Sequence, residues 1–424
     1  MILKKHSKKH ALLVLQAYLF PSLNRFLQRL LASFLLFIKD ISNNNMHDFI
    51  VVGAGPTGLY ASIELAKRNN HVLVLEEDKR IGIPRHCTGV ISYEAAKLIG
   101  NSAFNSAVNK INSAIFKYGK KSFEISFPSE TTLILDRIKF EELLFEESEK
   151  LGNEIILAKR VKRIRSLKYK VIVDADKEYE AKALIYAAGS KPSLLDFLKA
   201  PVSIPAIQYE IEGEVENDKS VEIIFSNEAK NFFVWKAPTS SNSFLLGLAN
   251  SEISPKKALD KYIEKSAIKG KIRAIYSGKI IISGALERNV FQNIAIIGDS
   301  AGHVKPTTGG GLFFGILGAK IIGSLFPYYI ENKNNNILKK IIHLNRKFIN
   351  ERINRMKKFS KIFFSLSEKQ KEIILDSLFK SGAIKEISID MQDFHENVIS
   401  LFLKDLSLSY KGILSLIETY LEHA

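Results

Sequence analysis

The feature that most constrains the fold is a glycine-rich turn, Gly53-Ala54-Gly55-Pro56-Thr57-Gly58, between two short apolar segments. The segment before it, Asp48 to Val52, is apolar and β-branched, which is typical of a buried strand. Residues 59–67 have helical character, and residues 72–75 are predicted to form a second strand that ends at Glu76. A strand, turn, helix and strand followed by a carboxylate at this spacing predict dinucleotide binding.

Each glycine of this turn has its own physical role. Gly53 permits the tight turn, Gly55 lets the backbone approach a pyrophosphate at the helix N-terminus, and Gly58 lets helix and strand pack closely. Glu76 is placed to accept hydrogen bonds from a ribose. The glycines alone would be weak evidence, because glycine turns have many uses, but here both strands and the acid are present.

A second glycine-rich region indicates which dinucleotide binds. An apolar strand at residues 293–297 leads to Gly298-Asp299-Ser300-Ala301-Gly302, and the segment from Thr307 to Leu312 contains three more glycines. NAD dehydrogenases have no need of such a distant element, whereas flavoproteins of the glutathione-reductase type use it. In those proteins the Asp contacts the ribityl or phosphate part of FAD, and the next helix N-terminus stabilises the reduced flavin. The sequence therefore predicts an FAD site.

Length and charge restrict the class of protein. A chain of 424 residues with 46% hydrophobic residues can build two or more domains around a substantial core. The net charge of +16 suits nucleic acid, an anionic membrane surface or an anionic substrate. No zinc-finger spacing and no RNA-binding signature accompany this charge, so nucleic acid is not an expected partner. The single cysteine, Cys87, excludes intramolecular disulfides and a cysteine-ligated iron–sulfur cluster within the chain. A cytoplasmic location is the expectation that follows.

Residues 1–45 differ in character from the rest. They carry seven Lys or Arg against one acid, Asp40, and their two apolar runs are each too short to span a bilayer. No signal-peptide cleavage site is evident. We expect an upstream extension that is not part of the fold, with translation of the working protein beginning near Met46. An amphipathic anchor on the inner face of the membrane is the alternative.

The pattern along the chain predicts an α/β protein with a Rossmann-like FAD-binding domain of the glutathione-reductase type. This domain is expected to comprise residues 46–200 and 290–330. Short β-rich segments in 201–289 predict an inserted antiparallel sheet that covers a substrate cavity. Residues 331–424 are predicted to be helical, and residues 337–371 carry eleven Lys or Arg against two Glu. That stretch is a solvated face or, alternatively, contacts anionic lipid headgroups.

Two further segments resemble one family of FAD enzymes. The loop Arg85-His86-Cys87-Thr88-Gly89-Val90-Ile91-Ser92 and the strand Phe233-Val234-Trp235-Lys236-Ala237-Pro238, together with Gly247, are similar to segments of the geranylgeranyl reductases. The resemblance runs from Met46 to about residue 330. In that family a cysteine loop lies beside the flavin, and an aromatic strand followed by a glycine lines the prenyl cavity.

The resemblance implies roles for particular residues. The implied cofactor-binding residues are those of the two glycine-rich regions, the cysteine loop and two positions between them: Gly53, Gly55, Gly58, Glu76, Cys87, Thr88, Arg137, Val161, Asp299, Gly311 and Leu312. The implied substrate residues are Phe233, Trp235, Pro238 and Gly247. Cys87, or a water held by its loop, is the candidate proton donor, and no metal is expected.

Departures from the family pattern affect the substrate more than the cofactor. Ala237 stands where the family has Phe, and Ala249 replaces a second Gly, so the accepted chain length and headgroup do not transfer. Simpler explanations exist for single residues. Trp235 can be a core residue of an alternating strand, Arg137 a surface charge, and Cys87 an inert buried thiol.

The sequence thus predicts an FAD-dependent oxidoreductase that reduces carbon–carbon double bonds of geranylgeranyl chains in isoprenoid membrane lipids. Its expected partners are a prenyl lipid, an electron donor that is a nicotinamide cofactor or a ferredoxin, and the membrane surface. The alternatives are a flavin monooxygenase of an aromatic or isoprenoid substrate, an electron-transfer flavoprotein, and a lipid-binding protein without FAD. Ala188 stands where hydroxylases of the hydroxybenzoate type have Asp, which disfavours the monooxygenase.

Overall fold

The computed structural model describes residues 46–191, 193–380 and Asp393. The expected extension at residues 1–45 lies outside this range, and so does most of the chain after residue 380.

The described elements follow one another in this order: β1 Met46–Val52, α2 Pro56–Ala66, β2 Val72–Leu75, β3 Val90–Ser92, α3 Tyr93–Ile99, α4 Asn101–Asn105, β4 Ala107–Ile111, β5 Ser113–Tyr118, β6 Lys121–Ser126, β7 Thr132–Leu135, α5 Arg137–Lys150, β8 Glu154–Ile156, β9 Arg163–Ser166, β10 Val171–Asp174, β11 Glu178–Tyr186, β12 Ser203–Glu212, β13 Ser220–Phe225, β14 Val234–Ser240, β15 Ser243–Ala249, α6 Pro255–Ser266, β16 Lys271–Ile281, β17 Val290–Phe291, β18 Ile294–Ile296, η1 Gly298–Ala301, α7 Leu312–Asn332, α8 Asn335–Asn345, η2 Arg346–Asn350, α9 Glu351–Ser365 and α10 Glu368–Lys380.

The first sheet is the mainly parallel sheet of a Rossmann-like fold. Its strands lie in the order β17-β18-β11-β1-β2-β8, with β10 paired to β11 and β9 paired to β10, and β1, β2 and β8 pair in parallel. Successive residues of β1 enter different cores, because side chains of a strand alternate between its two faces. Phe49 and Val51 belong to one hydrophobic cluster, whereas Ile50 and Val52 belong to another. Burial on both faces explains the nearly continuous apolar composition of these strands.

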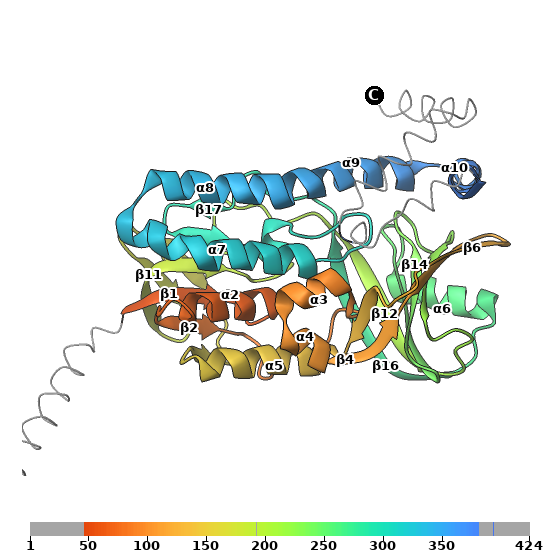
Figure 1. Cartoon of the computed structure of the whole chain (residues 1–424), viewed down its shortest axis with the longest axis horizontal. Helices are drawn as coiled ribbons and strands as arrows, with labels where there is room; N and C mark the ends of the chain where they lie inside the picture. Colours follow the sequence, from red (N-terminus) through yellow and green to blue (C-terminus); the bar gives the residue numbers. More distant parts are fainter. Residues whose placement is uncertain (1–45, 192, 381–392, 394–424) are drawn as a thin grey trace, which may run out of the picture. The chain divides into compact units, whose positions relative to one another are not determined.

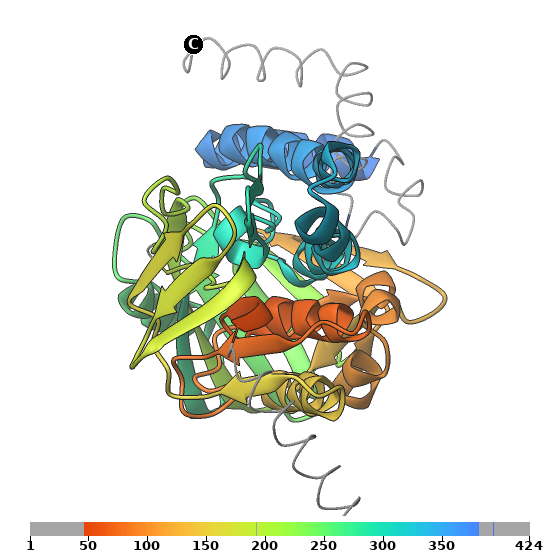
Figure 2. The ribbon, with the colours of Figure 1, turned by 90° about the vertical axis from the view of Figure 1, so that its left-hand side faces the viewer.

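Helices cover the first of these faces. α2 packs against α5 and α7, and Figures 1 and 2 both show α2 and α7 side by side. α7 is long and apolar enough to cross a membrane by length and composition. Most of its length is buried against the sheet and its neighbours, including Phe314, Ile322 and Phe326, so it serves here as a core helix.

The second sheet has seven strands in the order β16-β12-β15-β14-β13-β5-β6. Two features differ from the expected insertion at residues 201–289. β5 and β6 come from residues 113–126, upstream of that segment, and β13 pairs with β5 in parallel. This one parallel pair makes the sheet mixed. Parallel neighbours need a long crossover connection, and about 100 residues separate β5 from β13. A small third sheet, β3-β7-β4, lies outside both.

The described C-terminal part is helical. Figure 1 shows α8 and α9 continuing one another along one side of α7, with α9 extending toward the seven-stranded sheet. α9 buries Ile353, Met356 and Phe363 and exposes lysines between them. These spacings of three and seven residues, about one and two helical turns, give the helix one apolar face.

Candidate active site

The site is a single cavity of about 1390 Å³ that both sheets and the C-terminal helices help to line. Its volume exceeds the several hundred Å³ that one ordinary ligand needs. All eleven residues expected at the cofactor line it: Gly53, Gly55, Gly58, Glu76, Cys87, Thr88, Arg137, Val161, Asp299, Gly311 and Leu312. The structure thus brings together segments that are almost 260 residues apart in sequence.

The glycine turn has no room for side chains except on the cavity side. A Cβ at Gly53 would lie 2.4 Å from the Ala187 carbonyl oxygen, and one at Gly58 would lie 2.0 Å from the Gly53 oxygen. Gly53 also has φ +99°, a conformation that other residues rarely adopt. A Cβ at Gly55 would meet nothing within 4 Å. Its open position is where a phosphate can approach the backbone.

Two helix N-termini open onto the cavity. α2 begins after Gly55 with no acidic residue in its first turn and no side-chain cap, and α7 begins in the same way after Gly311. The first N–H groups of a helix have no partner within it, and the helix dipole places partial positive charge there. Both ends are therefore suited to the negative groups of a dinucleotide.

Glu76 directly follows β2 and bonds to the glycine turn that follows β1. Its Oε2 accepts a hydrogen bond of 2.6 Å from the Ala54 N–H, and its Oε1 accepts one of 2.9 Å from the Asp78 N–H. Each carboxylate oxygen retains acceptor capacity, since a carboxylate offers about four lone-pair positions. The same side chain can hold the loop and a ribose hydroxyl.

Arg137, Asp299 and Cys87 lie together on the cavity wall. Arg137 is buried and pairs with Glu141, while its Nε has no partner within the described part of the chain. Burial opposes its charge, but Cys87 and Glu141 together raise the pKa of Arg137 above its usual value. Burial raises the pKa of Asp299, and Arg137 counteracts this only in part. At this point the wall therefore places the Arg137 cation beside an acid that is costly to ionise.

A polar chain connects the cysteine loop to the second sheet. The Thr88 hydroxyl donates a 2.7 Å hydrogen bond to Gln208 Oε1 on β12, and the same oxygen accepts a weak 3.4 Å bond from Trp235 Nε1. Gln208 is 2% exposed, and its Nε2 has no partner among the residues that the structure describes. Gln208 was not predicted, because a single Gln on an alternating strand carries no sequence signal.

The four residues expected at the substrate divide into two groups. Phe233 and Trp235 line the cavity, with ring centroids 6.2 Å apart at an angle of 76°. Gly247 and Pro238 do not line it. Gly247 faces Trp235 across β14 and β15, and a Cβ there would lie 2.4 Å from the indole. Gly247 therefore contacts Trp235 and not the cavity, and the Pro238 carbonyl accepts a hydrogen bond from Asn109.

Sequence reasoning missed the contribution of the C-terminal helices. Phe359, Phe363, Phe364 and Leu375 line the apolar part of the cavity. Phe363 lies against Phe225 of β13 at 5.3 Å, and Phe364 stacks on Phe232 at 5.6 Å. The spacing of Phe359 and Phe363, one helical turn apart within a basic stretch, was the available signal.

A buried polar group on the cavity wall was also missed. Lys305 donates a 3.0 Å hydrogen bond to Asp393, whose other oxygen accepts from Ser92. All three line the cavity. The Lys305 backbone also bonds to Gly309 and Gly310, which fixes the loop before α7.

The two histidines near these loops are placed differently. His303 is fully buried outside the cavity, and burial lowers its pKa to about 3, so it is neutral. His86 lines the cavity and its Nδ1 lies 2.7 Å from the Ser277 carbonyl oxygen.

Comparisons with known proteins agree with this geometry. Residues 47–221 match the pyridine nucleotide-disulphide oxidoreductase family. Digeranylgeranylglycerophospholipid reductase 1 of Methanopyrus kandleri is 27% identical over 67% of this chain and 81% of its own. A geranylgeranyl bacteriochlorophyll reductase-like protein from Thermoplasma acidophilum has the same fold, with a TM-score of 0.75, 18% identity, and coverage of 88% of this chain and 99% of its own. The chain is a FAD-dependent oxidoreductase, and its sequence is similar to those of the geranylgeranyl reductases.

The fold is shared with other flavoproteins. The p-nitrophenol 4-monooxygenase of Pseudomonas putida superposes with a TM-score of 0.66 at 14% identity, covering 82% of this chain and 98% of its own. At this identity the likeness shows the fold alone. The oxidoreductase has a glycine turn open at Gly55, two uncapped helix N-termini and an unpartnered Arg137 Nε within its described part, and these fit FAD.

Proposed function

We propose that this enzyme reduces carbon–carbon double bonds of the prenyl chains of isoprenoid lipids. The observation that carries the proposal is the continuation of the cofactor cavity into an apolar, aromatic compartment. The names of the reductase relatives support the same substrate class. A saturated or unsaturated hydrocarbon chain offers no polar group, so only an apolar wall can hold it.

The wall would align the alkene and exclude water. Residues from three elements contribute: Val221 and Ile223 of β13, Phe233 and Trp235 near β14, and Phe363 of α9. An isolated alkene is a poor hydride acceptor, so its reduction requires close alignment in a dry site. Bound FAD in its reduced form supplies the hydride.

The second hydrogen must arrive as a proton, and Cys87 is our candidate donor. Its side chain is exposed on the cavity wall, and its Sγ accepts a 3.4 Å hydrogen bond from the Gly89 N–H. Arg137 lies close enough to interact with the thiol. The positive charge of Arg137 would stabilise the sulfur anion left after proton transfer.

The substrate headgroup would meet cationic side chains. Lys236 and Lys279 line the cavity on the second sheet. The lysines exposed on α9 would add attraction to anionic lipid headgroups, so we propose peripheral contact with the inner face of the membrane. A nicotinamide cofactor or a ferredoxin remains the proposed electron donor.

An anaerobic assay tests the reaction class. Purified holoenzyme, with its flavin reduced chemically by dithionite, is mixed with a geranylgeranyl phospholipid and the product is analysed by mass spectrometry. We expect products heavier by pairs of hydrogen atoms, because hydride and proton are the only atoms transferred. The second candidate is a monooxygenase, a class of enzyme that includes a protein of the same fold. Product that forms only in air and gains oxygen would establish that candidate and overturn ours.

A further inference from the structure

Three potential metal ligands meet at the edge of the parallel sheet opposite the cofactor. His47 is the second residue of β1, His71 directly precedes β2, and Glu154 is the first residue of β8. These three strands are adjacent and parallel. Their amino ends therefore place the three side chains together, whereas Gly53 and Glu76 follow the carboxyl ends.

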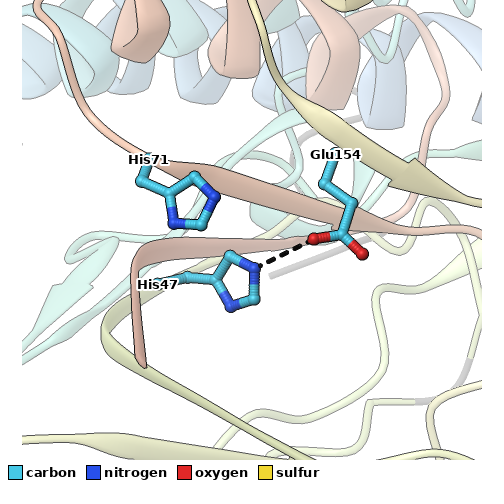
Figure 3. Close-up of side chains that lie close together, drawn as sticks. All are labelled: His47, His71 and Glu154. Carbon is cyan, nitrogen blue, oxygen red and sulfur yellow. Dashed lines mark hydrogen bonds and ion pairs between the residues drawn. The ribbon is translucent and has the colours of Figure 1, made fainter. Parts of the chain in front are cut away.

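The side chains converge in space, as Figure 3 shows. His47 Nε2 lies 3.3 Å from a Glu154 carboxylate oxygen, and the two imidazole rings stack with centroids 4.5 Å apart. One potential ligand atom from each residue lies within 4.8 Å of the others. Two ligands held by zinc at about 2.1 Å in tetrahedral geometry are about 3.4 Å apart. The separation of His47 and Glu154 already has this value.

We propose that His47, His71 and Glu154 form a binding site for one divalent transition-metal cation. Two imidazoles and one carboxylate are ligands that zinc and its neighbours bind well, with a position left for water. Only modest rotation of His71 and Glu154 is needed, because both are exposed at the surface. His71 is positioned through its backbone, whose N–H donates a 2.8 Å hydrogen bond to Asp48.

Ordinary structural roles account poorly for this cluster. His47 is 8% exposed, and within the described residues its Nδ1 has no hydrogen-bond partner. Its other ring nitrogen faces Glu154, whose side chain is 52% exposed. A hydrogen-bonded pair so open to water contributes little to stability. A bound cation would instead connect the first residues of three neighbouring strands.

The expected role is structural and separate from the redox site. His47 and Gly53 are six residue steps apart along an extended strand, which corresponds to about 20 Å. A metal at this distance cannot touch the flavin or the substrate. It would stabilise the folded protein, because the unfolded chain does not hold the three ligands together.

Zinc binding to chelator-treated, FAD-loaded full-length protein tests the site. We expect one zinc per chain at micromolar concentration and a rise in melting temperature on adding zinc sulfate alone. His71→Ala and Glu154→Gln should each weaken this binding at least tenfold while the visible flavin spectrum is unchanged. Both residues are exposed, so neither change should prevent folding.

The matched control is His343→Ala, which removes an exposed histidine on α8. It should leave the stoichiometry and affinity for zinc unchanged. The control is needed because the chain has nine histidines. Equal zinc affinity in wild type and His71→Ala, or binding seen only at millimolar zinc, would overturn the proposal.

Discussion

The cofactor half and the substrate half of the cavity are built by different means. Around the glycine turn, backbone atoms touch backbone atoms, and the space for a Cβ at Gly53 or Gly58 is already occupied by carbonyl oxygens. On the seven-stranded sheet and α9, side chains such as Trp235 and Phe363 define the surface. The first arrangement permits few substitutions, and the second permits many of similar volume. We therefore expect cofactor binding to be rigidly specified and substrate choice to be adjustable.

The sharpest test of this contrast is Gly58→Ala. The added Cβ would lie 2.0 Å from the Gly53 carbonyl oxygen, so helix α2 or the turn must move. We expect near-complete loss of bound FAD, measured as the ratio of visible to protein absorbance. Gly55→Ala is the matched change, because its Cβ meets no protein atom. That variant should keep the melting temperature of the apoprotein and weaken FAD alone. Full flavin content in Gly58→Ala would contradict a backbone-specified cofactor half.

Cys87→Ala should slow the reduction of the alkene without removing FAD from the protein. We expect the purified protein to retain its flavin, since the Cys87 side chain is exposed and its hydrogen bond with the Gly89 N–H is long, at 3.4 Å. Loss of a positioned proton donor typically slows turnover by roughly 10²–10⁴-fold. The rate of alkene reduction under single-turnover conditions measures this effect. A normal rate would assign the proton to another group, whereas loss of FAD would make Cys87 a structural part of the cofactor loop.

Trp235→Ala tests the substrate half of the cavity, whose surface is defined by side chains. Removal of the indole should slow prenyl reduction roughly tenfold to a hundredfold, because the alkene is less well aligned. FAD content should not change, since the Trp235 Nε1 contact with Gln208 is long and weak. Substitution by Phe should restore part of the rate. If Trp235→Ala is fully active, the prenyl chain does not lie against this strand.

Of these substitutions, Asp299→Asn should have the smallest effect, a change in the melting temperature of the apoprotein. Burial raises the pKa of Asp299, so the folded protein binds this proton more tightly than the unfolded chain. The aspartate therefore costs stability as pH rises above its usual pKa, and the cost disappears in acid. The apoprotein of Asp299→Asn should melt at a higher temperature than wild type at pH 7, with little difference near pH 3. A lower melting temperature at pH 7 would show that the carboxylate stabilises the fold.

The same contrast explains what the sequence could predict. The predicted cofactor residues lie in short continuous segments whose glycine spacing is imposed by local backbone geometry, and all eleven line one cavity. The pairing of β13 with β5 depends on residues about 100 positions apart, and no local pattern encodes such a partner. Phe359 and Phe363 were visible as a helical pair, but their destination depends on how α9 packs. Gln208 was not predictable, since its role depends on neighbours from two other segments.

The contact of Trp235 with Gly247 has a consequence for how this family of cavities can diversify. A Cβ at residue 247 would lie 2.4 Å from the indole and 2.6 Å from the Ile207 carbonyl oxygen, so a side chain there is blocked by backbone as well as by Trp235. A smaller residue at 235 therefore does not by itself make room for a larger one at 247. Position 235, in contrast, can change while 247 stays glycine, so we expect this part of the compartment to be reshaped for another lipid at 235 alone.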